Sequence, residues 1–199
     1  FPIDNTNISE EESDNRLKKR VFDWLLYLNL PVVYILVILS LITISTTTLQ
    51  THEFIGLVFT VGIVLGVNGI NVAHELGHRQ TTNERFIGKA LLLPALYMHF
   101  YIEHNYGHHL HAATKEDPAT ARYNQSVYSF WFTSIFRQYI NAWSIQNKLL
   151  KNNNNSFISL KNDMLWYVIL QATYLSVVFV FFGFSGFLFA LFAGVVGFV

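Results

Sequence analysis

The sequence predicts an all-α fold, a polytopic bundle of transmembrane helices with histidine-bearing helices on its cytoplasmic side. Hydrophobic residues make up 52% of the 199 residues and charged residues only 13%, unlike the composition of a soluble domain. Several apolar runs are long enough to cross a bilayer. Five histidines lie in two short groups beside these runs, at spacings that suit metal ligands. We treat residues 1–199 as a single membrane-embedded domain.

The predicted spans cover residues 30–49, 54–73, 165–182 and 184–199. Each comes close to the roughly 20 apolar residues that a helix needs to cross the hydrocarbon core. The first span is preceded by basic residues, at Arg16, Lys18, Lys19 and Arg20. The positive-inside rule therefore places residues 1–29 in the cytoplasm. The first two spans then form a hairpin that returns the chain to the cytoplasmic face, and the last two form a second hairpin near Gly183.

Two further segments are expected to lie at the membrane surface. Residues 86–101 are mostly apolar, but a single crossing there would put the two histidine groups on opposite faces, where they could share no metal. We therefore expect this segment to lie in the interface, or to dip and return. Residues 127–149 are rich in aromatic residues and interrupted by polar ones, which predicts a second surface helix.

Charge and cysteine content exclude several classes of protein. Thirteen basic and thirteen acidic residues give a net charge of zero, so bulk charge does not favour a nucleic-acid partner. The chain has no cysteine, which rules out disulfides, iron-sulfur clusters and thiolate zinc sites. Imidazole and carboxylate groups remain as the metal ligands that the chain can offer.

The clustered histidines predict a metal site. His74 and His78 are four residues apart, as are His104 and His108, so each pair shares a face of an α-helix. His109 should point about 100° away around the helix, which suits a second metal ion. Neutral imidazoles favour first-row metals, and a nitrogen-rich site with open positions fits non-haem iron that binds oxygen.

Three other residues are candidates for hydrogen-bond partners that orient these ligands, namely His99, Glu103 and Asp117. His99 has the alternative role of an interface residue, the role that we assign to His52 and His111. Asp117 has the alternative role of a solvated loop residue beside Glu116 that stabilises the turn at Pro118.

Two other functions fit parts of the pattern. Residues 74–78 satisfy the motif His-Glu-x-x-His of zinc proteases, with Glu75 as the general base. A second histidine group at matching spacing argues against a protease, because a single zinc ion does not need it. A metal-handling or transport protein would place charged or polar residues inside the spans, and Asn68 and Asn71 are the main examples.

At these motifs the chain resembles the integral-membrane alkane monooxygenases, or alkane omega-hydroxylases, of the histidine-box fatty acid desaturase and hydroxylase superfamily. The first histidine box corresponds to HELGH at residues 74–78, and the second corresponds to EHNYGHH at residues 103–109. The second box continues into ATKEDPATAR at residues 113–122, which separates it from generic desaturases. Residues 22–28 and 68–74 also look like family sequence.

The resemblance implies two non-haem iron ions, dioxygen as co-substrate, and hydroxylation of the terminal methyl group of medium or long n-alkanes. It implies electrons from rubredoxin, reduced by rubredoxin reductase, and a place in the bacterial inner membrane. A related fatty-acyl desaturase, or an aryl-methyl or sterol-type hydroxylase, remains the alternative. The family's third histidine box and opening spans are not in this sequence. We therefore expect an internal part of a longer protein, inactive on its own.

Overall fold

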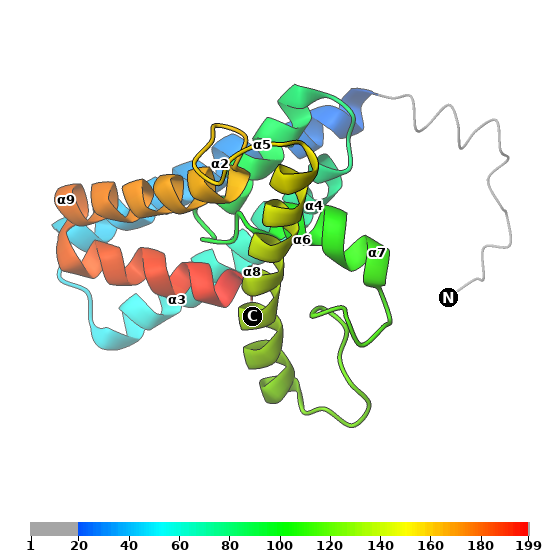
Figure 1. Ribbon diagram of the computed structural model, residues 1–199. Helices are drawn as coiled ribbons and strands as arrows, with labels where there is room; N and C mark the ends of the chain where they lie inside the picture. Colours follow the sequence, from blue (N-terminus) through cyan, green and yellow to red (C-terminus); the bar gives the residue numbers. More distant parts are fainter. Residues whose placement is uncertain (1–19, 199) are drawn as a thin grey trace, which may run out of the picture.

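The computed structural model describes residues 20–198, and every regular element in that range is a helix (Figure 1). Helix α2 (Arg20–Thr46) leads through a short polar link into α3 (Thr51–Val64), the π-helical segment η1 (Leu65–Ile70) and α4 (Asn71–Gly77). Helix α9 (Asp163–Phe198) ends the described part. The stretches 20–46, 51–77 and 163–198 are long and apolar enough to cross a membrane. The predicted all-α bundle is confirmed.

Helix α9 consists of two arms joined at Gly183. This residue has φ of 68° and ψ of −170°, a conformation that glycine adopts easily and other residues do not. Figure 1 shows the orange and red arms of α9 lying next to each other and running in opposite directions. The two arms meet at the residue where the predicted hairpin turns, and that each arm crosses the membrane stays a prediction.

The helix that contains the first predicted span starts before that span. Helix α2 begins at Arg20 rather than at residue 30, and it continues without a break through Pro31. Asp23 and Asn29 interrupt the apolar residues of its first turns, so a search for uninterrupted apolar runs starts only at residue 30. Arg16, Lys18 and Lys19, on which the predicted cytoplasmic placement of residues 1–29 rests, lie outside the part of the chain that the structure describes.

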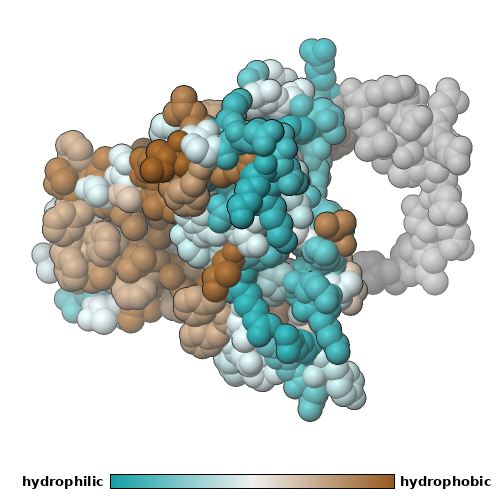
Figure 2. All heavy atoms as spheres, in the orientation of Figure 1, coloured by the Kyte–Doolittle hydropathy of each residue, from teal (hydrophilic) through white to brown (hydrophobic). Residues whose placement is uncertain are grey.

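Close packing and one polar contact hold the spanning helices together. Buried residues follow one face of α2 at helical spacing, at Val33, Val37, Leu41 and Ile44. The Asn68 amide on η1 donates a 2.9 Å hydrogen bond to the Asn29 side chain on α2, which joins two spans through paired polar groups. Many outward apolar residues of the bundle are exposed, and they form the brown region over the spans in Figure 2.

The remaining helices lie at one end of the spans. Helix α5 (Thr82–Leu92) ends just before Pro94, and a turn at residues 93–99 reverses the chain into α6 (Phe100–Glu103). The π-helical segment η2 (His104–His108) and the short α7 (His109–His111) follow. Helix α8 (Val127–Asn152) runs across the ends of the spanning helices in Figure 1. Residues 86–101 therefore return, as predicted, and residues 127–149 belong to a helix.

Candidate metal centre

The first two histidines of the cluster come from the end of the second spanning stretch. His74 lies within α4, and His78 is the residue that caps its C-terminus. The next residue, Arg79, forms ion pairs of 3.4 Å with Asp23 on α2 and 3.1 Å with Glu75 on α4. These pairs hold the end of α4 against α2, so the two imidazoles project from a fixed position at the membrane face.

The second histidine group has a different local geometry from the predicted one. Residues 104–108 form a π-helix, whose wider turn brings residues five apart onto neighbouring positions. The Nε2 atoms of His104 and His109 lie 2.9 Å apart as a result. The rings of His104 and His108 stack with their centres 5.4 Å apart, but His109 does not point away from His104, as expected from an α-helix.

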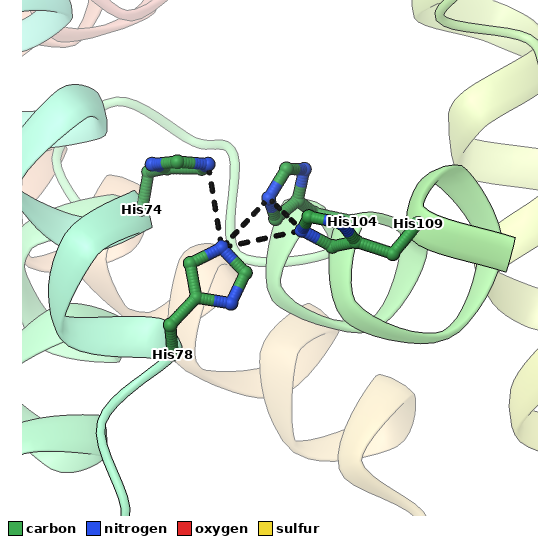
Figure 3. A group of neighbouring side chains, drawn as sticks. All are labelled: His74, His78, His104 and His109. Carbon is green, nitrogen blue, oxygen red and sulfur yellow. Dashed lines mark hydrogen bonds between the residues drawn. The ribbon is translucent and has the colours of Figure 1, made fainter. Parts of the chain in front are cut away.

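Four imidazoles converge on one point (Figure 3). The Nε2 atom of His78 lies 3.4 Å from that of His74, 3.1 Å from that of His104 and 3.3 Å from that of His109. One ligand atom from each of the four residues fits within a span of 4.8 Å. The two sequence groups thus meet on one side of the spans, as the shared-metal argument requires.

This arrangement fits a bound metal ion. Ligand atoms placed tetrahedrally at about 2.1 Å from a metal ion are about 3.4 Å apart. The four Nε2–Nε2 contacts of 2.9–3.4 Å are close to this spacing, although the whole cluster spans 4.8 Å. Burial, together with the neighbouring imidazoles, lowers the pKa of His104 to about 3, and burial lowers the pKa of His109. Both imidazoles are therefore neutral at pH 7, as metal ligation requires. Four nitrogen donors without a thiolate suit a first-row transition metal.

His108 is turned toward a carboxylate instead of the four-histidine cluster. Its Nδ1 atom lies 2.9 Å from Oδ2 of Asp117, which is only 4% exposed. The Asp117 carboxylate also accepts hydrogen bonds from the Ala119 amide and the Thr120 hydroxyl. A buried aspartate held in this way fixes the orientation and tautomer of the imidazole ring and leaves Nε2 for another partner.

The other two candidate partners, His99 and Glu103, have different surroundings. The His99 ring packs against Tyr97 and Tyr139, and within residues 20–198 neither ring nitrogen has a hydrogen-bond partner. Burial lowers the pKa of His99 to about 4. Glu103 is 1% exposed and accepts a 3.3 Å hydrogen bond from Asn141, and burial raises its pKa to about 7.

Two residues that sequence reasoning did not select complete this environment. Thr120 and Asn141 donate to Asp117 and Glu103, respectively. For Thr120 the pattern Asp-x-x-Thr was an available signal, because an aspartate often bonds to backbone or hydroxyl groups two or three residues later. Asn141 lies 38 residues from Glu103, and no local pattern could have joined them.

A cavity of about 480 Å³ opens beside His74. Most of its lining is apolar or aromatic, from η1, from the segment 97–100 and from the end of α9, and includes Ile70, Tyr97, Phe100 and Phe198. A cavity of this kind can accept a hydrophobic molecule and bring one of its ends next to the histidine cluster.

Comparisons with known proteins agree with the fold and the cluster. The family model described as "Fatty acid desaturase" matches residues 51–199. Alkane 1-monooxygenase 1 of Alcanivorax borkumensis is 37% identical over 82% of this chain and 40% of its own length. Alkane 1-monooxygenase of Ectopseudomonas oleovorans is 35% identical over 92% of this chain and 45% of its own length. The corresponding enzyme of Pseudomonas putida is 33% identical over the same shares.

The fold and the site define a membrane protein with a histidine cluster at one end of its spanning helices. The chain belongs to the fatty acid desaturase family, and its similarity to the alkane 1-monooxygenases extends over most of its length. It spans less than half the length of these curated relatives.

Proposed function

We propose that the protein is a membrane monooxygenase with a non-haem diiron site that hydroxylates the terminal methyl group of medium or long n-alkanes. The observation that carries this proposal is the convergence of four imidazoles beside a cavity with aromatic and aliphatic residues in its walls. The similarity to proteins named alkane 1-monooxygenase supports the substrate class. We further propose rubredoxin, reduced by rubredoxin reductase, as the electron donor.

In this proposal His74, His78, His104 and His109 hold one iron ion, and His108 contributes its Nε2 to the second. Bound iron supplies the activation of dioxygen that oxidation of an unactivated C–H bond needs. The Arg79 ion pairs keep the end of α4 in place, and Asp117 keeps the proton of His108 on Nδ1. We propose that the metal site faces the cytoplasm of a bacterial inner membrane.

The cavity residues would determine where the alkane is oxidised. An alkane has no polar group for recognition, so its orientation depends on the shape of an apolar site. The cavity beside His74 brings Tyr97 and Phe100 next to a cluster histidine. A chain that enters this cavity end-on would present its terminal methyl group to the metal and exclude water from it.

The alternative function of a zinc protease has less support. A catalytic zinc ion is held by three protein ligands and keeps a position for water, whereas four histidines converge here. In addition, Glu75 forms an ion pair with Arg79, which occupies the carboxylate that a protease would use as its general base. The related desaturases and hydroxylases share the same type of cluster. The identity of the reaction product is therefore what distinguishes these enzyme classes.

The experiment is a labelled-oxygen assay of the full-length protein in membranes with n-octane, a reduced rubredoxin system and ¹⁸O₂. We expect 1-octanol that carries ¹⁸O. The variant His104→Ala should form none, whereas His52→Ala, which changes an exposed histidine outside the cluster, should keep the activity. An alkene product without oxygen would show a desaturase, and peptide cleavage in place of oxidation would show a protease. Either result would refute the proposal.

A further inference from the structure

A second and larger cavity lies on the surface of the protein, and none of the four cluster histidines lines it. Its volume is about 700 Å³, and its walls come from α5, α6, the end of α8 and the beginning of α9. Three basic side chains line it, Arg85, Lys89 and Lys161, together with one acidic side chain, Asp163. Because α9 enters the apolar bundle directly after Asp163, the cavity lies at the level where lipid headgroups meet the protein.

The charges in this cavity are only partly compensated. Lys89 forms a 3.0 Å ion pair with Asp163, and its ammonium group lies 4.5 Å from the centre of the Tyr101 ring. Arg85 donates to the backbone carbonyl of Arg79 and to the neutral side chain of Gln80. Between residues 20 and 198, neither Arg85 nor Lys161 forms an ion pair with a carboxylate. The cavity therefore presents two positive charges that an anion could neutralise.

A mostly polar loop with three exposed apolar side chains borders the cavity. In the segment 153–162, Phe157 is 50% exposed, Ile158 is 87% exposed and Leu160 is 80% exposed. The loop is held in place, because the Trp143 ring stacks on Phe157 and the Trp166 ring nitrogen donates to the Leu160 carbonyl. In Figure 1 it lies beside the start of α9, and a brown patch marks the same region in Figure 2. Three adjacent exposed apolar side chains at the start of a span are typical of a segment that contacts lipid.

We propose that this cavity binds the headgroup phosphate of an anionic membrane lipid, whose acyl chains lie along residues 157–160. The basic side chains account for recognition of the phosphate, and the exposed Phe157, Ile158 and Leu160 side chains account for a lipid as its source. A free phosphate ion would use the charges but leave the loop exposed. Anionic lipids attract basic groups at the membrane surface through the same electrostatic force.

The test is to place the full-length protein in nanodiscs of phosphatidylcholine with a minor share of phosphatidylglycerol. The protein is then extracted in mild detergent, and the retained lipids are identified by native mass spectrometry. We expect preferential retention of phosphatidylglycerol and a loss of about fivefold in Lys161→Gln, the effect of one basic group near a membrane surface. The double change Ile158→Ser and Leu160→Ser should also reduce retention. Lys148→Gln is the matched control, since Lys148 is exposed on α8 and does not line the cavity.

Three other outcomes would refute the proposal that the cavity binds an anionic lipid. Equal retention of the two lipids, or equal losses in Lys161→Gln and Lys148→Gln, would show that the cavity has no preference of its own. Displacement of phosphatidylglycerol by millimolar inorganic phosphate would assign the site to the free anion. Weaker binding of an acidic soluble protein to Lys161→Gln, with lipid retention unchanged, would make the cavity a protein-docking surface. Thermal unfolding of every variant verifies that the fold is intact.

Discussion

The surroundings of Asp117 distinguish between the two roles that the sequence left open for it. Its carboxylate is buried and accepts from the Ala119 amide and the Thr120 hydroxyl, and it contacts Nδ1 of His108. The neighbouring Glu116 is exposed and makes no contact with a histidine of the cluster among the described residues. The structure therefore favours the role of Asp117 in orienting His108 over the role of a solvated loop residue.

This contact predicts the effect of replacing Asp117 with Asn in the full-length protein. Loss of a carboxylate that orients a metal-ligating histidine typically costs about 10- to 100-fold in metal affinity or activity. We expect a loss of this size in iron affinity, measured by chelator competition, with a similar protein level in the membrane. Glu116→Gln serves as the matched control and should change little. Equal and small effects at the two positions would return Asp117 to the role of a loop residue.

Glu84 predicts a pH-dependent contribution to stability. The carboxylate accepts hydrogen bonds from Thr81 and Tyr27, and the Thr81 hydroxyl is the main cause of its lowered pKa. A carboxylate whose folded pKa is lowered stabilises the fold above its unfolded pKa, and this stabilisation is lost as the pH falls through the folded pKa. Glu84→Gln should therefore lower the unfolding temperature at neutral pH, and the difference from wild type should shrink in acid. A difference that does not change with pH would contradict this role of Glu84.

Residue spacing predicted the composition of the cluster better than its geometry. The motifs at residues 74–78 and 103–109 identify five histidines, and four of them converge. The spacing could not show that residues 104–108 form a π-helix, since that conformation depends on tertiary packing. The prediction therefore pointed His109 away from His104, whereas the structure brings the Nε2 atoms of these two residues to within 2.9 Å.

At the scale of helices, glycine packing determines how close two spans can approach. A Cβ atom on Gly66 of η1 would lie 2.8 Å from the backbone oxygen of Gly197 on α9, and backbone cannot move aside cheaply. A Cβ atom on Gly56 of α3 would meet no other atom within 4 Å. Small residues at such contacts allow the close approach that stabilises helix pairs in membranes.

The expected result is that Gly66→Ala destabilises the protein by about 1–3 kcal/mol, the usual cost of overpacking. Gly56→Ala should cause no loss, because alanine favours the helix and meets no neighbour there. Thermal unfolding in detergent, followed by circular dichroism, would measure both variants. A Gly66→Ala protein as stable as wild type would show that η1 and α9 are not packed as described.

The positions of the helices were largely predictable, but some boundaries were not. Apolar runs gave the spans because lipid imposes a length of about 20 residues, and Gly183 marked the turn between the last two. The start of α2 at Arg20 was missed, because Asp23 and Asn29 interrupt the apolar run before residue 30. For residues 86–101 the need to bring the two histidine groups together predicted a surface segment or one that dips and returns, since hydropathy alone does not distinguish a crossing from a return.

At the scale of the whole molecule, the fold predicts one topology. The histidine cluster can form only if the segments after His78 and after His109 lie on the same side of the membrane. The chain has no cysteine, so single cysteines can be introduced at Gln80, Thr114 and Thr48. Cysteines at Gln80 and Thr114 should react with membrane-impermeant reagents from the cytoplasmic side, and a cysteine at Thr48 from the other. Labelling of Gln80 and Thr114 from different sides would make a shared metal site impossible.

Metal analysis of the purified full-length protein is the sharpest test of the proposed iron site. We expect bound iron, and we expect that alanine at His74, His78, His104 or His109 removes iron and alkane oxidation together. His52→Ala should keep both, because His52 is exposed and lies outside the cluster. Stoichiometric zinc in place of iron, or full iron content in all four cluster variants, would refute the assignment of these histidines as the ligands of an iron site.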